Sequence, residues 1–228
     1  MEDGRNKVKI DVIYEDNHII VANKPFSIPT QEDESKDMDM LRIIKGYIKE
    51  KYNKPGDVFI GLLHRLDRVS GGVMVFARTS KAASRLSEQI RKKKVSKTYL
   101  IVVEGILESK EGEMIDYLLK DKDKNKVKSV DSQTQNSKEA ILQYKVLDEK
   151  DNMSLVEVNL ITGRSHQIRV QFSSRGFPIL GDMKYGSKNP REKSIALWSN
   201  SLSFEHPTLK ETMKFESNPP KEYPWNLF

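Results

Sequence analysis

The chain has 228 residues and a formal net charge of +6 at pH 7, so it can bury a substantial core and attract an anionic partner. It contains no cysteine, which excludes disulfides, thiol nucleophiles and cysteine-zinc sites and favours a reducing, cytoplasmic location. No apolar run approaches the roughly 18 residues that a membrane span needs, and residues 1–7 lack a signal-peptide core. Nucleic acid is therefore the first candidate partner and a membrane surface the second.

Strands and helices are mixed along the first half of the chain. Apolar runs predict strands over residues 10–14, 18–23, 62–66 and 73–77, the first two forming a pair. Apolar residues at helical spacing predict a helix over residues 38–51. A second helix is expected over residues 80–92, with Ser80 as its N-cap.

The second half continues this mixture. Strands are predicted over residues 99–103, 140–147, 155–161, 195–204 and 212–215, and residues 120–128 are expected to form an exposed hairpin tip. A turn at Thr162-Gly163 precedes a helix over residues 165–174, which Gly176 and Pro178 end. No repeat or flexible linker divides the chain. We therefore expect a tail over residues 1–9 and one α+β domain over residues 10–228.

The segment from Gly61 to Ala77 places a charged loop between two buried strands. A carboxylate in such a place is costly unless it is paired or used, and Asp67 is the carboxylate of this loop. Taken alone, Asp67 is better explained as a turn aspartate that caps local N–H groups.

A basic segment follows the helix predicted over residues 80–92. Its cations include Arg91, Lys92, Lys93, Lys94 and Lys97. Some cations at a helix end are explained by the helix dipole and by solvation. This density exceeds that need, so we predict that the segment binds phosphates and makes RNA affinity depend strongly on salt.

Several segments together resemble one enzyme family. In the order of the family's motifs, they are residues 13–25, His64-Arg65-Leu66-Asp67, Lys97-Thr98-Tyr99, residues 162–169 and Gly181-Asp182-Met183-Lys184-Tyr185-Gly186. They resemble the RluA-type RNA pseudouridine synthases. The resemblance implies an α+β fold with a mixed, largely antiparallel central sheet, flanking helices and a catalytic cleft. It implies an enzyme that isomerises uridine to pseudouridine in structured RNA, such as an rRNA or tRNA stem-loop, without cofactor or metal. We expect the protein to be a monomer.

The same resemblance assigns roles to three residues. Asp67 is the catalytic residue, Tyr99 stacks on the flipped uracil, and Arg169 pairs with Asp67, because a guanidinium beside a carboxylate fixes its orientation. Without the family, Tyr99 is a sheet tyrosine and Arg169 a solvated helix arginine. The apolar Ile168 and Phe172, four residues apart, would anchor that helix and turn Arg169 away from solvent.

The remaining assignments concern RNA contact. By resemblance, Arg65 fills the gap left by the flipped base; otherwise it is a salt-bridging surface arginine. The other residues expected to contact RNA are His64, Arg164, His166 and Gln167. The two histidines are better explained as structural or phosphate-contacting residues than as catalytic ones, because no third ligand accompanies them at metal spacing.

Two rival functions stay open at this stage. One is a metal-dependent phosphodiesterase that uses His64, Asp67, His166 and Asp182; the other is a non-catalytic RNA-binding module. The chain also departs from the family pattern: Ser70-Gly71-Gly72 replaces threonine-serine-glycine, and we expect Gly71 to loosen the turn. An N-terminal S4 domain, common in relatives, is not expected.

Overall fold

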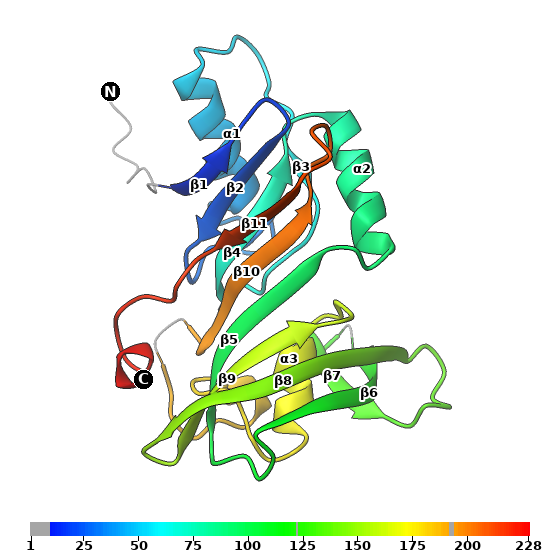
Figure 1. The fold of residues 1–228 in the computed structure, drawn as a ribbon, viewed down its shortest axis with the longest axis vertical. Helices are drawn as coiled ribbons and strands as arrows, with labels where there is room; N and C mark the ends of the chain where they lie inside the picture. Colours follow the sequence, from blue (N-terminus) through cyan, green and yellow to red (C-terminus); the bar gives the residue numbers. More distant parts are fainter. Residues whose placement is uncertain (1–9, 122, 192–193) are drawn as a thin grey trace.

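A computed structural model describes residues 10–121, 123–191 and 194–228. The predicted tail, residues 1–9, lies outside the described residues. One mixed sheet runs through the molecule from β1 to β7, and Figure 1 shows it passing from an upper to a lower half. Its strand order is β1-β2-β4-β10-β5-β9-β8-β6-β7, with β3 on β4 and β11 on β10.

The strands of the upper half are β1 (Asp11–Glu15), β2 (Ile19–Lys24), β3 (Gly61–Leu62), β4 (Gly71–Ala77), β10 (Leu197–Glu205) and β11 (Thr212–Glu216). Those of the lower half are β5 (Ser96–Glu104), β6 (Glu111–Asp121), β7 (Lys126–Val130), β8 (Lys138–Lys150) and β9 (Met153–Leu160). Neighbouring strands pair antiparallel except for β4 and β10, which are parallel. The predicted α+β class with a largely antiparallel sheet is confirmed.

Three α-helices are described: α1 (Met40–Lys51), α2 (Ser80–Arg91) and α3 (Gln167–Ser173). Successive side chains of β2 and β4 point to opposite faces of the sheet, and α1 and α2 pack on these two faces. Ile20 and Phe76 share one core with Ile44 of α1, whereas Val21 belongs to a second core with Leu86 of α2. None of the helices in the described residues is long and apolar enough to cross a membrane.

The N-cap expected for α2 needs a correction. Ser80 is already inside the helix, and the N-cap is Thr79, whose side chain accepts a hydrogen bond from the Ala82 N–H. Thr79 has the extended backbone of a cap residue, so its hydroxyl reaches back over the first turn. For α1 the predicted boundary moves by two residues, and Asp39 is the cap.

The predicted strand over residues 62–66 was largely wrong. Only Gly61–Leu62 pair with β4, and the chain then leaves the sheet to form the loop that carries Asp67. The strands β6 and β7 were missed, although the hairpin tip between them was predicted. These strands bury few apolar residues, among them Met114, Leu118 and Val127, and charged residues between them interrupt the apolar pattern that predicts a strand.

The parallel seam between β4 and β10 is short and depends on glycine. It consists of the pairs Trp198 with Gly71 and Ser199 with Gly72. A Cβ atom at Gly71 would overlap the Trp198 ring, and one at Gly72 would overlap the Ser199 backbone. The expectation that Gly71 loosens the turn was therefore wrong, because this residue is a buried strand position packed under a tryptophan.

Candidate active site

Asp67 lies on the loop between β3 and β4, and neighbouring groups hold that loop on several sides. The Thr30 hydroxyl donates to the Leu66 carbonyl at 2.9 Å and accepts from the Leu66 N–H at 3.2 Å. The Ser70 hydroxyl donates to the Asp67 carbonyl at 3.0 Å. The backbone around Asp67 is thus fixed while its side chain, 28% exposed, faces a cleft.

Lys24, at the end of β2, supports the same loop from inside the protein. Its ammonium group is wholly buried and donates to the carbonyls of Pro25, Arg68 and Ser70 at 2.6–3.2 Å. Burial lowers the pKa of Lys24 to about 7, while the charge of Asp67 acts in the opposite direction. An otherwise costly buried cation therefore joins β2 to both sides of Asp67.

Arg169 reaches Asp67 from α3. Its Nη1 donates to Oδ2 of Asp67 at 2.9 Å, while Nε and Nη2 donate to the two carboxylate oxygens of Asp182 at 2.7 and 2.8 Å. Burial alone lowers the pKa of Arg169, but the hydrogen bonds and charges of Asp182 and Asp67 outweigh it and raise the pKa. Ile168 and Phe172 anchor α3 in the core, as expected, and leave Arg169 5% exposed.

The carboxylates of Asp182 and Asp67 contact the Arg169 guanidinium in different ways. Asp182 is 1% exposed and takes the bidentate side, so it fixes the plane of Arg169. Asp67 takes one remaining N–H through Oδ2, and within the described residues its Oδ1 has no hydrogen-bond partner. The free oxygen of Asp67 is therefore available to a molecule in the cleft.

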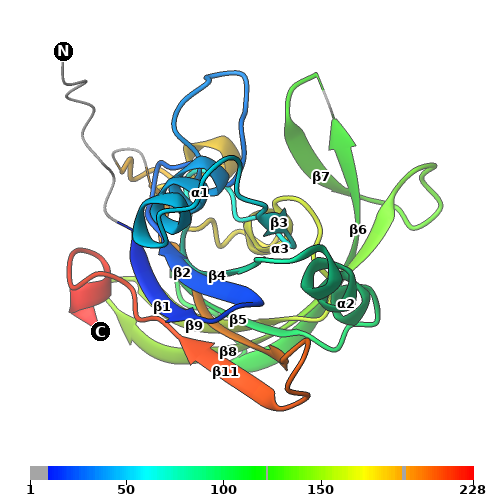
Figure 2. The same ribbon diagram turned by 90° about the horizontal axis from the view of Figure 1, so that it is seen from above.

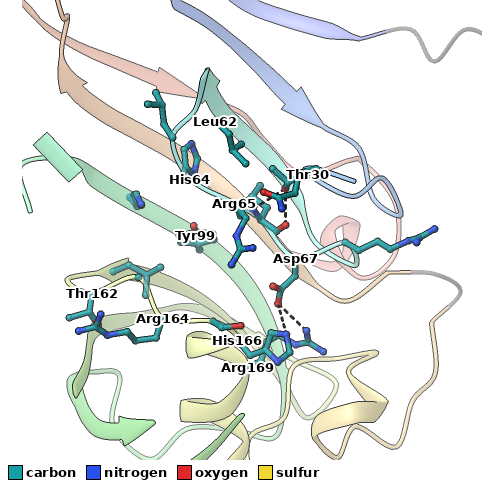
Figure 3. A pocket seen from close by; sticks show the side chains of 18 of the residues that line it. Thr30, Leu62, His64, Arg65, Asp67, Tyr99, Thr162, Arg164, His166 and Arg169 are labelled. Atoms are coloured by element: carbon teal, nitrogen blue, oxygen red, sulfur yellow. Dashed lines mark hydrogen bonds and ion pairs between the residues drawn. The ribbon is translucent and has the colours of Figure 1, made fainter. Parts of the chain in front are cut away.

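The cleft has a volume of about 1100 Å³ and lies between the Asp67 loop, the end of α2, β5 and the start of α3. Arg65, Asp67 and Tyr99 point into the same space, with Arg169 and His166 beyond Asp67 (Figure 3). Small-molecule pockets span roughly 300–1,000 Å³, so there is room for a nucleotide and its neighbours.

Tyr99 and Arg65 differ in how they are held. Tyr99 is 7% exposed on β5; burial and then the charge of Asp67 raise the pKa of its hydroxyl, so the phenol stays protonated. Arg65 is exposed and has no hydrogen-bond or ion-pair partner among residues 10–121, 123–191 and 194–228. The alternative in which Arg65 forms a surface salt bridge therefore finds no partner in this part of the chain.

The two histidines are held differently. His64 accepts the Val75 N–H through Nε2 at 3.2 Å, and burial lowers the pKa of His64 to about 3, so it is neutral. Its Nδ1 is buried and has no hydrogen-bond partner in the described residues, so the ring presents no exposed nitrogen for the predicted RNA contact. His166 caps α3 with a left-handed backbone (φ 52°), and its Nε2 lies 3.9 Å from Oδ2 of Asp67.

The other residues expected to contact RNA divide into cleft and non-cleft positions. Arg164 lines the cleft while its Nε donates to the Glu139 carbonyl. Gln167 is 3% exposed, accepts from Thr162 and the Arg164 N–H, and donates to the Ile141 carbonyl. The structure therefore gives Gln167 a supporting position behind the turn at Thr162.

The basic segment is also split. Arg91, Lys93 and Lys97 line the cleft. Lys92 and Lys94 instead line a separate pocket of about 330 Å³, where Lys92 forms an ion pair with Glu88. Only the first set faces the space that Asp67 faces.

Within the described residues, no group of three His, Cys, Asp or Glu side chains is arranged to hold a metal ion. Of the four residues that the phosphodiesterase alternative would use, Asp182 has both oxygens on Arg169, and His64 uses Nε2 for the Val75 N–H. These side chains therefore do not offer the donor set which that alternative needs.

Comparison with known proteins gives the family. The family model described as RNA pseudouridylate synthase matches residues 18–174. The chain belongs to this family. It is 33% identical to the dual-specificity RNA pseudouridine synthase RluA of Haemophilus influenzae, over 91% of this chain and 92% of that protein. It is 30% identical to the ribosomal large subunit pseudouridine synthase D of Pseudomonas aeruginosa, over 96% of this chain and 71% of that protein.

A solved structure shares the fold. The human RNA pseudouridylate synthase domain containing 4 superposes with a TM-score of 0.79 at 24% identity, covering 95% of this chain and 91% of that one. The expected resemblance to RluA-type synthases is confirmed, and the protein is an enzyme of the RNA pseudouridine synthase class, an isomerase.

Sequence reasoning did not assign three residues that support the site. Lys24 and Tyr185 belong to segments that were recognised as family motifs but were given no role, and Asp182 was considered only as a metal ligand. A usable signal existed for Asp182, because a buried arginine beside one carboxylate needs further acceptors for its remaining donors.

Proposed function

We propose that the protein converts uridine to pseudouridine in structured RNA, with ribosomal RNA as substrate and Asp67 as the catalytic residue. One observation carries this proposal: a loop held by Thr30, Lys24 and Ser70 presents Asp67 to the cleft, with one oxygen on Arg169 and the other free. The choice of ribosomal RNA rests on the relative named as a ribosomal large subunit pseudouridine synthase.

The reaction breaks the N1–C1′ bond of uridine and joins C5 to C1′. A carboxylate beside the sugar and base can attack C1′, add to C6, or remove a proton from the sugar, and Oδ1 of Asp67 is the atom that would do so. Glycosidases use two carboxylates that flank the bond. Asp182, the other carboxylate near Arg169, is buried and occupied, which favours isomerisation over hydrolysis.

The target base must leave the RNA stack to reach Asp67. Tyr99 offers an aromatic ring with a protonated hydroxyl in the same cleft. Stacking on an aromatic ring contributes about 1–3 kcal/mol per base. Arg65, exposed and without a partner in the described residues, would occupy the gap that the base leaves. Arg91, Lys93 and Lys97 along the cleft would bind phosphates on the flanking strand.

The test uses ribosomal RNA transcribed in vitro, hence unmodified, with tritium at C5 of uridine. When C5 bonds to C1′ the tritium leaves to water, so its release measures the isomerisation itself. We expect release with the wild-type protein and none with Asp67→Asn, which should still bind the RNA within a few-fold because many cations contribute to binding.

The matched control is Asp57→Asn, an exposed aspartate outside the cleft that forms a surface ion pair with Lys45 and accepts the N–H of the neighbouring Val58. It should release tritium at the wild-type rate. Near-normal release by Asp67→Asn, or conversion that depends on an added divalent ion rather than on Asp67, would remove the proposed role of this residue.

A further inference from the structure

Tyr185 connects the candidate catalytic residues to the β6–β7 hairpin. It ends the short 3-10 helix Met183–Tyr185 and is 7% exposed. Its hydroxyl oxygen accepts the Val127 N–H of β7 at 2.9 Å and lies 2.7 Å from Nδ1 of His166. α3 packs against β6 and β7, which Figure 2 shows on the same side of the molecule as α3, so this contact joins the hairpin to the helix that carries Arg169.

These contacts set the proton positions on His166. The Tyr185 oxygen already accepts from Val127, and its own proton is buried and needs an acceptor. Nδ1 of His166 is the atom at hydrogen-bond distance, so the hydroxyl donates to Nδ1. In the neutral imidazole the proton must then be on Nε2, which is the nitrogen facing Oδ2 of Asp67.

The ring of Tyr185 has a second function at the same place. The Arg169 guanidinium carbon lies 4.9 Å from the ring centroid, and the Lys126 ammonium of β7 lies 5.7 Å from it. Cations over an aromatic face are attracted to it. One side chain thus contacts Arg169 through its ring and His166 through its hydroxyl.

We propose that Tyr185 and His166 act together as positioning residues for Asp67, with the Tyr185 hydroxyl holding His166 as the Nε2–H tautomer. That N–H is directed at Oδ2, the oxygen that already accepts from Arg169, so both donors hold the same oxygen and leave Oδ1 for the substrate. The separation of 3.9 Å is longer than a hydrogen bond, and we expect it to shorten when RNA binds, because catalytic hydrogen bonds tighten in the substrate complex. The inference rests on the proposed function of Asp67.

The charged and titratable groups around His166 support a neutral ring. They come from each element packed against it: Asp67 from its loop, Arg169 from α3, Lys184 and Tyr185 from the 3-10 helix, and Lys120 from β6. Burial, Arg169, Lys184 and Lys120 lower the pKa of His166, and only Asp67 raises it. A donor to Nδ1 favours the neutral form further.

The experiment measures single-turnover tritium release from the same C5-labelled ribosomal RNA. In Tyr185→Phe the ring stays over Arg169 but the hydroxyl is removed. We expect the rate of chemistry to fall on the order of 5-fold, the size of one net hydrogen bond, with RNA affinity unchanged.

Two substitutions of His166 distinguish the role of its Nε2–H from the role of its left-handed backbone. The left-handed conformation favours asparagine, whereas glutamine extends far enough to place an N–H where Nε2 lies. His166→Gln should therefore be faster than His166→Asn. If Tyr185 acts through His166, the double variant Tyr185→Phe/His166→Asn should be no slower than His166→Asn alone.

Tyr47→Phe is the matched control, since it removes a tyrosine hydroxyl that donates to Glu15 at 2.9 Å, far from the cleft. It should change thermal stability without changing the rate. The inference is overturned by a wild-type rate in Tyr185→Phe, by effects that multiply in the double variant, or by asparagine exceeding glutamine at position 166. Absence of tritium release by the wild-type protein would instead reject the proposed function.

Discussion

Replacing Arg169 with alanine would leave a negative charge buried without its partner. Asp182 is 1% exposed, and both of its oxygens accept from Arg169 at 2.7 and 2.8 Å. Removing one partner of a buried pair costs about 3–5 kcal/mol, because the remaining charge keeps its desolvation penalty. That is a large part of a typical free energy of unfolding of about 5–15 kcal/mol. For a domain of this size it would lower Tm by roughly 6–20 °C.

Urea denaturation and a thermal scan measure this destabilisation, and tritium release measures the accompanying drop in activity. The informative comparison is Arg169→Ala/Asp182→Asn, in which the stranded charge is also removed. We expect the double variant to be more stable than Arg169→Ala by more than about 1 kcal/mol, since contacting residues couple by about 0.5–3 kcal/mol. A destabilisation below about 1 kcal/mol in Arg169→Ala, or a double variant that is less stable still, would refute the reasoning about a buried ion pair.

Two further predictions concern the cleft. Tyr99→Phe should fold and bind RNA normally but release tritium more slowly, because only the hydroxyl beside the reacting base is removed; normal turnover would exclude a role for that hydroxyl. Arg91→Ala/Lys93→Ala should reduce the salt dependence of RNA binding by a slope of about 0.7–0.9 for each phosphate that the variant no longer neutralises. Lys92→Ala/Lys94→Ala removes the same charge outside the cleft and should change the slope less; equal slopes would place RNA binding elsewhere.

Apolar patterning predicted the elements whose apolar residues enter a core. The pair β1–β2, the helix α1 and the strands β8, β9, β10 and β11 were confirmed because their apolar residues face a core that neighbouring residues also form. The strand prediction failed for residues 63–66, which leave the sheet, because the sequence does not show which segments pair with each other. The same holds for the N-cap of α2, where Thr79 and Ser80 carry equivalent hydroxyls.

The candidate site was predicted through motifs rather than through geometry. The pairing of Arg169 with Asp67 was expected, and the two groups meet at 2.9 Å although 102 residues separate them. What sequence could not give is how the groups around that pair share their donors and acceptors. That Asp182 occupies two donors of Arg169, or that Lys92 points away from the space Lys93 faces, depends on side-chain direction, which spacing alone does not determine.

The position of β10 has a consequence for synthesis of the chain. β4 and β5 are joined by α2 and so are close in sequence, yet in the sheet β10 lies between them. Until residues 197–205 leave the ribosome, both strands present unpaired backbone edges, which are the groups through which nascent chains aggregate. The enzyme therefore completes its sheet only after β10 has been synthesised, and the period of greatest risk of misassociation falls between synthesis of β5 and synthesis of β10.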